Sequence, residues 1–379
     1  MAKSKPKNDA DSGGKKKSAQ RSESATLPLA ADIARVDRDL LQLLERRASL
    51  ILDASRDADA AIRQILASAL SGEKLKQLAE NSPGPLPPRC VEAIIRELTS
   101  GCRSLVRQPR IAFMGPMYSY SHLAAIHRFG QSVEFVPVAT IAAVFEDVEQ
   151  GHSDYGLVPV ENSTDGRIAD TLDMFTRLPV RICGEIDLKI HHFLLGKCPR
   201  NDVKEVYSKP QAISQCRNWL AKHLPAARTI EVTSTSTAAQ LAGEKPGAAA
   251  IASIQAGVHY GLEILAENIE DNPGNITRFA VIGGDRPERT GNDRTALLFQ
   301  TEHRPGALAE AMNIFKRYKL NLTWIESFPV PGMARAYLFF VEMEAYETDV
   351  RFRRAIGALQ KKTLRLEILG SFPVATVVE

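Results

Sequence analysis

The sequence lacks any long hydrophobic run. No stretch of eighteen apolar residues occurs in its 379 residues, which excludes a transmembrane helix, so no membrane partner is expected. The N-terminus carries lysines with no apolar segment behind them, so a secretory signal is not expected. The five cysteines are an odd number and form no CxxC pair: Cys90, Cys102, Cys183, Cys198 and Cys216. This pattern predicts reduced thiols in a cytoplasmic protein and neither a disulfide framework nor a zinc site.

The folded part of the chain also lacks an excess of basic charge. Residues 1–22 carry seven Lys/Arg and two Asp, a net charge of +5, whereas the whole chain has +3. We therefore expect residues 1–26 to form a basic, disordered tail. Contact of this tail with nucleic acid or an anionic surface is the alternative. The remaining residues show no basic stripe, so no nucleic-acid partner is expected.

Three different patterns follow along the chain. Apolar residues recur at helical spacing from Ile33 to Ile51, and further helices are expected over about 60–80 and 88–106. With no strand signal, residues 27–108 are predicted to be an all-helical N-terminal domain. From Arg110, short β-rich runs alternate with helical patterns, which predicts an α/β domain with a largely parallel sheet over 109–285. Its strands are expected at 111–114, 155–160, 186–195, 248–252 and 279–282. Residues 293–379 show the order β-α-β-β-α-β of a ferredoxin-like domain.

Hydroxyl and amide side chains gather at strand ends and helix starts of the α/β pattern. The four segments are 119–122, 161–163, 233–237 and 275–279. Ligands of open α/β sheets bind at the carboxyl ends of strands, and helix N-termini suit anions. The pattern therefore predicts a site for a small, oxygen-rich carboxylate. The alternative is that these Ser and Thr residues serve only as N-caps.

The motifs GPMYSYSHLAA, VPVENSTDG, VYSKPQAISQC, TSTSTAA and NITRF resemble the prephenate dehydratase family in order and spacing. The resemblance implies two α/β lobes similar to a type II periplasmic binding protein, over about 110–185 with 275–285, and 186–272. It also implies dehydration and decarboxylation of prephenate to phenylpyruvate, the committed step towards phenylalanine. This reaction needs no electron sink, so neither a metal nor a cofactor is expected.

The same resemblance implies residue roles. Thr277 would be central to catalysis by hydrogen-bonding the leaving oxygen, with Glu161 or His122 relaying a proton. Tyr118 stands where the family has a small residue, often Gly, and Lys209 replaces a His and would supply a cation for a substrate carboxylate. The residues expected to contact substrate are Ser121, Asn162, Ser163, Lys209, Gln211, Ser234, Thr235, Ser236, Thr237, Arg278 and Phe279.

Residues 27–108 resemble the all-helical chorismate mutases through IARVDRDLLQLLERR and GPLPPRCVEAIIREL. Arg47 matches one of the arginines that surround the chorismate dianion in that family. Other expected polar groups are missing, and their positions are occupied by Ala30, Ala58, Leu70, Ser71 and Val106. Three of these groups are cations, and losing them removes most of the electrostatic stabilisation on which the reaction depends. We therefore expect a non-catalytic domain kept for dimerisation or stability, and a fully bifunctional enzyme is the alternative.

Residues 294–371 resemble an ACT domain through RPGALAEAMNIF and NLTWIESFP. The family reads phenylalanine where two such domains pair, which implies an allosteric site at Gly306, Ala307, Leu308, Glu326 and Ser327. Phe328 replaces the Arg usual in the second motif. Feedback inhibition by phenylalanine is expected, with a purely structural dimerisation module as the alternative.

The complete interpretation is a cytoplasmic homodimer or homotetramer that dehydrates prephenate. An arogenate dehydratase differs only in the substrate's amine and stays open. A non-catalytic amino-acid sensor is the alternative from another functional class, because a two-lobed domain joined to an ACT domain also suits ligand binding.

Overall fold

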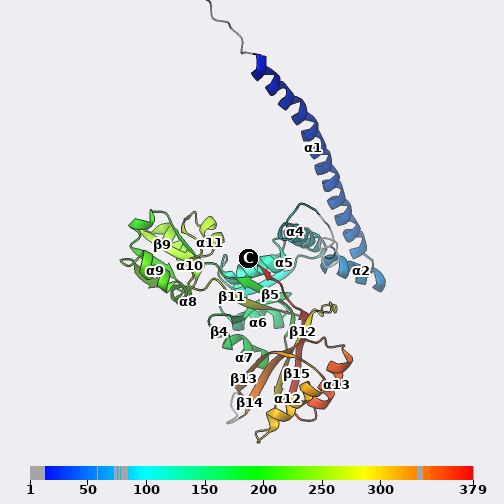
Figure 1. Cartoon of the computed structure of the whole chain (residues 1–379). Coiled ribbons are helices and arrows are strands. Elements are labelled where there is room, and N and C mark those ends of the chain that lie inside the picture. Colours follow the sequence, from blue (N-terminus) through cyan, green and yellow to red (C-terminus); the bar gives the residue numbers. More distant parts are fainter. Residues whose placement is uncertain are drawn as a thin grey trace, which may run out of the picture. The chain divides into compact units, whose positions relative to one another are not determined.

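The computed structural model describes residues 13–57, 59–71, 75, 77, 84–330 and 336–378. The chain divides into two compact units, Met1–Val106 and Arg107–Glu379 (Figure 1). No helix in the described part is long and apolar enough to cross a membrane.

The first unit is helical, as predicted. It consists of α1 (Gly13–Ser55), α2 (Ala60–Ser71) and α4 (Pro88–Val106). The helices contact one another, and Ile51 and Ile95 are buried between them. Residues 72–83 lie almost entirely outside the described residues, so the expected extension of the second helix to about 80 is not tested.

The start of α1 differs from the expected disordered tail over 1–26. The helix begins at Gly13, and only residues 1–12 of the tail lie outside the described residues. Residues 15–25 contain Lys, Ala, Gln, Arg and Glu, which have high helix propensity. Adding such residues to a helix that already exists costs little, because nucleation is the expensive step.

The α/β domain contains two sheets. The first has the order β16-β5-β11-β3-β1-β2, with β4 paired to β3. Its strands are β1 (Arg110–Met114), β2 (Glu134–Val138), β3 (Tyr155–Asn162), β4 (Gly166–Arg167), β5 (Arg181–Lys189), β11 (Ile276–Gly283) and β16 (Val377–Val378). Its helices are α5 (Tyr120–Phe129), α6 (Ile141–Glu149) and α7 (Ala169–Arg177).

The second sheet has the order β10-β6-β9-β7-β8. Its strands are β6 (Phe193–Gly196), β7 (Glu205–Ser208), β8 (Arg228–Glu231), β9 (Ala248–Ala252) and β10 (Glu263–Ala266). Its helices are η1 (Arg200–Asp202), α8 (Pro210–Gln215), α9 (Arg217–His223), α10 (Thr235–Glu244) and α11 (Ile254–His259). The chain passes between the two sheets through residues 190–192 and 267–275.

Both sheets are mixed, which corrects the expectation of a largely parallel sheet. β11 is antiparallel to β3 and to β5, and β6 is antiparallel to β9 and β10. The reason is that the chain crosses from the first sheet to the second and later returns. β11 therefore enters the first sheet from the second lobe and not after a helix that packs on the first sheet. The expected strand over 186–195 is likewise two strands, since the chain changes sheets within it.

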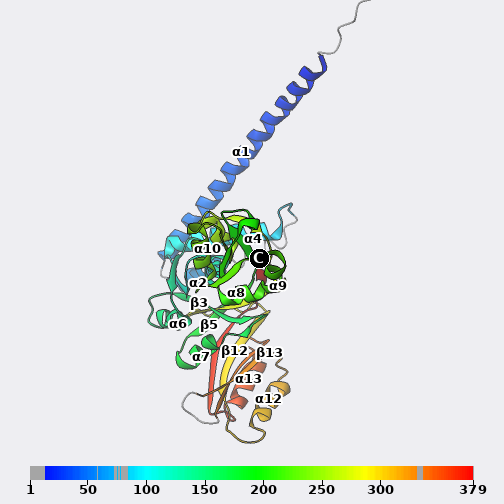
Figure 2. The same ribbon diagram turned by 90° about the vertical axis from the view of Figure 1, so that its left-hand side faces the viewer.

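The third sheet belongs to the ferredoxin-like domain. It consists of β12 (Asp293–Gln300), α12 (Ala307–Arg317), β13 (Leu322–Pro329), β14 (Tyr337–Met343), α13 (Val350–Leu359) and β15 (Arg365–Pro373). The order β13-β14-β12-β15 is antiparallel throughout, which confirms the predicted β-α-β-β-α-β arrangement. α12 and α13 pack against one face around Phe299, Phe315 and Phe352 (Figure 2).

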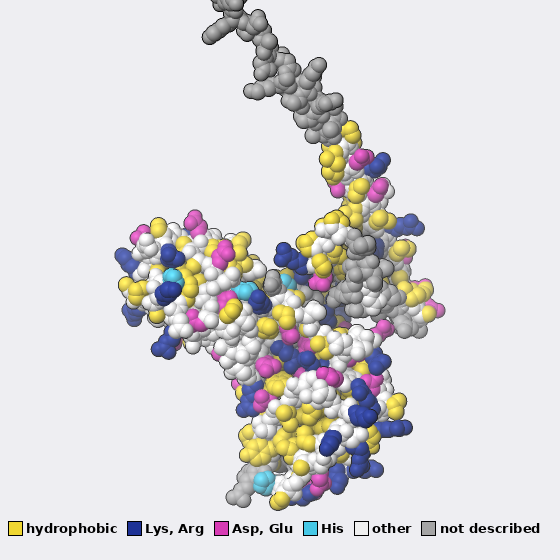
Figure 3. Space-filling view, viewed as in Figure 1, with side chains coloured by type: hydrophobic (Ala, Val, Ile, Leu, Met, Phe, Trp, Pro, Cys, Tyr) yellow, Lys and Arg dark blue, Asp and Glu magenta, His cyan; other side chains and the backbone are white. Residues whose placement is uncertain are grey.

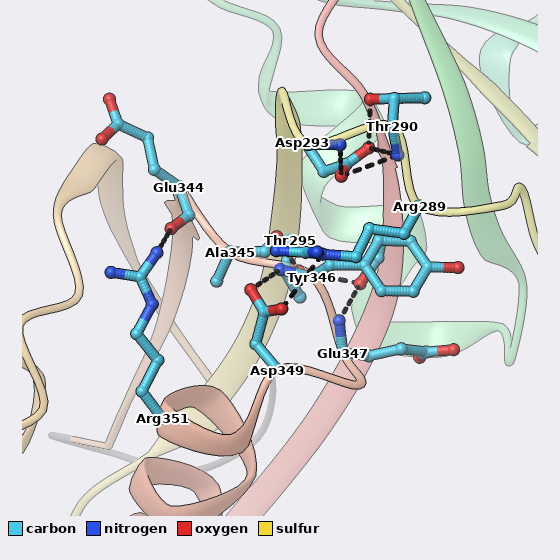
Figure 4. A network of polar contacts seen from close by, with 12 residues as sticks. Arg289, Thr290, Asp293, Thr295, Glu344, Ala345, Tyr346, Glu347, Asp349 and Arg351 are labelled. Carbon is cyan, nitrogen blue, oxygen red and sulfur yellow. Dashed lines mark hydrogen bonds and ion pairs between the residues drawn. The ribbon is translucent and has the colours of Figure 1, made fainter.

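The other face of this sheet packs against the α/β domain. Leu298 and Phe340 share one hydrophobic core with Phe145 and Phe175 of α6 and α7. A polar network closes the linker between the two domains, as Figure 4 shows. Arg289 pairs with Asp349 at 3.1 Å, and the Asp293 carboxylate accepts the backbone N–H of Thr290. The ferredoxin-like domain is therefore joined to the first sheet by both apolar and polar contacts.

Candidate active site

Thr277 lies on β11 opposite Asn162, the last residue of β3. Asn162 Nδ2 donates to Thr277 Oγ1 at 2.8 Å and to Asn275 Oδ1 at 2.9 Å. Asn162 Oδ1 accepts the backbone N–H groups of Thr164 and Asp165 at 2.9 and 3.0 Å. The two N–H groups fix which amide atom is the oxygen, because they can only donate. The Thr277 oxygen is thus an acceptor here, and its proton remains available to a ligand.

The polar network continues from Asn275 into the second lobe. Asn275 Nδ2 donates to Gln215 Oε1 at 3.0 Å, and His192 Nε2 lies 2.9 Å from the same oxygen. The Tyr120 hydroxyl lies 3.0 Å from His192 Nδ1. His192 is 2% exposed, and burial lowers the pKa of its imidazole. Because His192 and Asn275 lie on the two crossing segments, the network joins both crossings to Thr277.

The first turn of α5, directly after the β1–α5 loop, carries His122, which we expected to relay a proton. His122 is 3% exposed and stacks on Phe113 with ring centroids 5.1 Å apart. Its Nδ1 accepts the backbone N–H of Tyr118 at 3.0 Å, and burial lowers the pKa to about 4. A histidine that is neutral at physiological pH and embedded among rings is a poor proton source. Its hydrogen bond with the Tyr118 N–H instead stabilises the loop between β1 and α5.

Tyr118 itself adopts a backbone conformation that normally requires glycine. Its φ is 64°, in the left-handed region that side chains disfavour. Its ring stacks on His259 of α11 with centroids 3.9 Å apart, and its carbonyl accepts from Ser253 at 3.3 Å. These contacts to the second lobe compensate for the strain. They also explain how the chain tolerates a Tyr where the resemblance predicts a small residue.

The hydroxyl-rich segment at the start of α10 has two separate roles. Ser234 is the N-cap and accepts the Thr237 N–H at 3.0 Å, which matches the alternative that these residues serve as caps. Ser236 is fully buried and donates to the carbonyl of Met117 at 2.7 Å. Thr235 is 7% exposed. The segment therefore joins the second lobe to the β1–α5 loop.

Three expected site residues lie away from Thr277. Side chains alternate along a strand, so Arg278 and its cross-strand neighbour Glu161 occupy the opposite face of the first sheet. Arg278 is bound there by Glu185 and Glu342. Phe279 is 2% exposed within the hydrophobic core beside α5. Arg278 is therefore held by protein carboxylates and Phe279 lies in the core, whereas the proton relay expected of Glu161 stays a prediction.

The remaining expected residues differ in exposure. Ser121 is 6% exposed in the first turn of α5, and Lys209 is the half-buried N-cap residue of α8. Ser163 Oγ accepts the Ile276 N–H at 2.9 Å and donates to the Gly274 carbonyl. Gln211 is exposed, whereas Gln215 one turn later enters the network. The sequence-based reasoning missed Gln215 although it lies in the same motif, because only the helix orientation distinguishes the two.

In the helical unit, Arg47 reaches towards the other two helices. Its Nη1 lies 2.8 Å from Cys102 Sγ, and its Nη2 donates to the Ala69 carbonyl at 2.9 Å. Ala30 is exposed on α1, and Val106 is 39% exposed. Ala58 and the side chain of Ser71 lie outside the described residues. The guanidinium of Arg47 is therefore used to hold α1 against α2 and α4.

The ferredoxin-like domain has a cavity of about 400 Å³ beside the start of α12. It is lined by residues 301–305, Ala307, Leu308, Tyr337 and Phe339. Gly306 has φ 82°, a conformation that suits glycine, and precedes the helix. Glu326 pairs instead with Arg167 of the α/β domain at 2.6 Å, and Ser327 offers its carbonyl to the same arginine. Phe328 packs into the core shared with the α/β domain.

No group of three or more His, Cys, Asp or Glu side chains that could hold a metal ion occurs in the described ranges.

Two family models match the chain. Residues 111–287 match the prephenate dehydratase model, and residues 29–107 match the chorismate mutase type II model. A bifunctional chorismate mutase/prephenate dehydratase of Aquifex aeolicus is 40% identical over 356 residues, which are 93% of this chain and 98% of that protein.

Two solved structures are also similar to this chain. The prephenate dehydratase of Arthrobacter aurescens, in complex with L-Phe, superposes with a TM-score of 0.65 at 30% identity and covers 70% of this chain and 90% of that one. GqqA, a quorum-quenching acylase, superposes with a TM-score of 0.64 at 28% identity and covers 70% of this chain and 98% of that one. Since the fold alone accommodates both, the side chains around Thr277 have to distinguish the activities.

Proposed function

Because this chain belongs to the bifunctional chorismate mutase/prephenate dehydratase family, we propose that its α/β domain converts prephenate to phenylpyruvate, water and carbon dioxide at a site around Thr277. The observation that carries the proposal is the 2.8 Å hydrogen bond from Asn162 to the Thr277 oxygen. It orients the hydroxyl so that its O–H can donate a hydrogen bond to the ring hydroxyl that leaves, and the proton that completes the water molecule comes from solvent. Aromatisation drives the step, so a positioned hydrogen bond suffices.

The two-lobed architecture supports this proposal. In each sheet, one strand arrives from the other lobe and lies antiparallel between its neighbours, which supports the proposed likeness to a type II periplasmic binding protein. Ligands of such proteins bind between the lobes. Here Ser236 of α10 donates to the Met117 carbonyl after β1, and Gln215 at the end of α8 donates to Asp165 after β3. The hydroxyl and amide groups of these segments suit the carboxylates of prephenate.

The test is phenylpyruvate formation by the purified full-length chain. Thr277→Ala is expected to lower kcat at least about 100-fold with the fold intact, the usual cost of losing one hydrogen bond made in the transition state. Thr229→Ala is the matched control, since Thr229 is exposed on β8. Near-normal turnover by Thr277→Ala contradicts the proposed role. Binding of prephenate by the wild-type chain without turnover would support the sensor alternative, and parallel assays with arogenate decide which substrate is preferred.

We propose that the helical domain has lost chorismate mutase activity and serves oligomerisation. Arg47, which the resemblance assigns to chorismate, donates to protein atoms on the other two helices. Exposed apolar residues form one stripe along α1 with spacings of three, four or seven residues: Leu29, Ile33, Val36, Leu40, Leu43 and Leu50. Figure 3 shows hydrophobic side chains at the surface of this helix. Pairing with α1 of a second copy would bury this stripe. The alternative of a fully bifunctional enzyme predicts chorismate turnover.

We also propose that the ferredoxin-like domain is an ACT domain and that phenylalanine inhibits the enzyme through it. The cavity beside Gly306 offers apolar contacts from Leu308, Tyr337 and Phe339, and the Arthrobacter relative is in complex with L-Phe. Glu326 and Ser327 lie on β13 at the same end of the sheet, separated from this cavity by β14. A purely structural role of the domain would leave turnover unchanged by phenylalanine.

A further inference from the structure

Thr277 and Arg278 are adjacent on β11 but point to opposite faces of the first sheet. Thr277 meets Asn162 on one face. Arg278 lies on the other face, beside Glu161 on β3 and Asp187 on β5. The two residues share one peptide unit, so the position of the Arg278 side chain constrains the position of the Thr277 hydroxyl.

Two carboxylates hold the Arg278 guanidinium. Glu185 accepts from Arg278 Nε at 2.8 Å and forms an ion pair with Nη2 at 2.7 Å. Glu342 lies on β14 of the ferredoxin-like domain, and its Oε1 and Oε2 accept hydrogen bonds from Arg278 Nη2 at 2.8 and 2.7 Å. The Trp324 ring lies 5.5 Å from the guanidinium carbon. Arg278 is therefore fixed by the α/β domain and by two strands of the ferredoxin-like domain; we call Glu185, Arg278 and Glu342 the arginine clamp.

The two carboxylates of the arginine clamp are buried, and Glu185 accepts further hydrogen bonds. The side chains of Glu185 and Glu342 are 1% and 2% exposed. Glu185 also accepts from Arg294 at 3.1 Å and from the backbone N–H of Ala375 at 2.9 Å. Burial raises the pKa of Glu342 to about 7 and raises that of the neighbouring Asp187. Carboxylates in this position are costly, and apolar residues of similar volume would stabilise the fold at least as well. What the arginine clamp adds is a fixed position of the Arg278 side chain.

The ladder beside the clamp is irregular on one side. The pairing of β11 with β3 shifts register between Arg278 and Phe279. A bulge bends a strand and re-aims the side chains next to it. The pairing of β11 with β5 is regular at Thr277 and Arg278, and the arginine clamp adds a second constraint on β11 beside the shifted ladder.

We propose that Arg278 is a positioning residue for the dehydratase reaction, which it serves by holding Thr277 in place through the arginine clamp. The proposal rests on the catalytic role proposed for Thr277. Displacements of about 1 Å at a catalytic group cost roughly 100-fold in rate, so partial loosening of the clamp is measurable. Because Glu342 belongs to the ferredoxin-like domain, that domain takes part in positioning Thr277.

A double-mutant cycle in the full-length chain tests the proposal. Arg278→Lys keeps the charge but removes the two-pronged geometry. We expect it to lower kcat about tenfold with KM within about twofold of wild type. In the Thr277→Ala background the same substitution is expected to cost nothing further, since Arg278 acts through Thr277. Arg353→Lys, an exposed position on α13, is the control. Thermal unfolding of every variant separates a lower kcat from a smaller folded fraction.

The outcomes are distinct. A kcat for Arg278→Lys within about twofold of wild type overturns the proposal, and so does an undiminished loss in the Thr277→Ala background. Normal turnover by Thr277→Ala alone overturns the role of Thr277, and with it any action of Arg278 through that residue.

Removing the charge of either carboxylate tests the partners of Arg278. Glu185→Gln and Glu342→Gln should each lower kcat by about threefold, less than Arg278→Lys, because the other carboxylate stays. Glu344→Gln, exposed just after β14, is the matched control. If neither glutamine variant differs from that control, the arginine clamp does not position Thr277.

Discussion

The substitution Asn162→Asp tests whether the direction of the Thr277 hydroxyl matters for catalysis. Aspartate keeps the shape of asparagine and the oxygen that accepts the N–H groups of Thr164 and Asp165. It replaces the Nδ2 donor by a second oxygen that faces Thr277 Oγ1 and Asn275 Oδ1. Thr277 then donates its proton to the new carboxylate. The proton proposed to serve the leaving hydroxyl is no longer available to it.

The magnitude follows from the bonds that are lost. Withdrawing one preorganised donor from a transition state costs about 3 kcal/mol, or roughly 100-fold in kcat. Stability falls as well, since the hydrogen bond to Asn275 disappears and Asn275 Oδ1 then faces another acceptor, at about 1–3 kcal/mol for an unsatisfied group. The added negative charge repels the carboxylates of the substrate, so KM is expected to rise.

The assay is steady-state phenylpyruvate formation, with thermal unfolding measured on the same samples. Asn321→Asp, an exposed position before β13, controls for the added charge. Asn162→Ala is the companion variant, because it removes the donor without capturing the Thr277 proton. We expect Asn162→Ala to retain about tenfold more activity than Asn162→Asp. If Asn162→Asp keeps kcat within about threefold of wild type, the reasoning about proton direction is refuted.

Other predictions concern the remaining parts of the chain. The pKa of His122 is lowered to about 4 in the folded state. Its contribution to the free energy of unfolding is therefore complete above its unfolded pKa of about 6.5. This contribution is lost as pH falls towards 4, by at most about 3 kcal/mol. Denaturant unfolding between these pH values should show a shallower pH dependence for His122→Gln, and equal slopes would contradict this cause. Chorismate should remain unconsumed by a preparation that turns over prephenate; its loss would establish a bifunctional enzyme. Leu40→Glu combined with Leu43→Glu should lower the oligomer mass in sedimentation, and an unchanged mass would remove the α1 stripe from the interface. Phenylalanine should inhibit the wild type and act at least about tenfold more weakly on Gly306→Val, because valine disfavours φ 82°; equal inhibition of both proteins would place the effector elsewhere.

Much of the fold was predictable because it depends on local patterns. The third helix of the helical domain and the strand over 248–252 occur where hydrophobic periodicity placed them. The six elements of the ferredoxin-like domain follow the predicted order, since its strands and helices alternate with short turns. The mixed pairing of the first two sheets was not predictable in this way. It depends on a strand that arrives from another lobe, and no local pattern records that path.

For the site, the sequence by itself determined which residue types gather and where in the chain they lie. It placed Asn162 at a strand end and Thr277 at the start of the last strand of the domain, because those positions follow from patterns a few residues long. Only the tertiary structure decided which side chains meet. The alternation of a strand, with a register shift beside it, sends Thr277 to one face and Arg278 to the other. One turn of α8 brings Gln215 and not Gln211 to Asn275. Such choices depend on the packing of segments far apart in the chain, 60 residues for Gln215 and Asn275 and 115 for Asn162 and Thr277, and that packing is a property of the folded molecule.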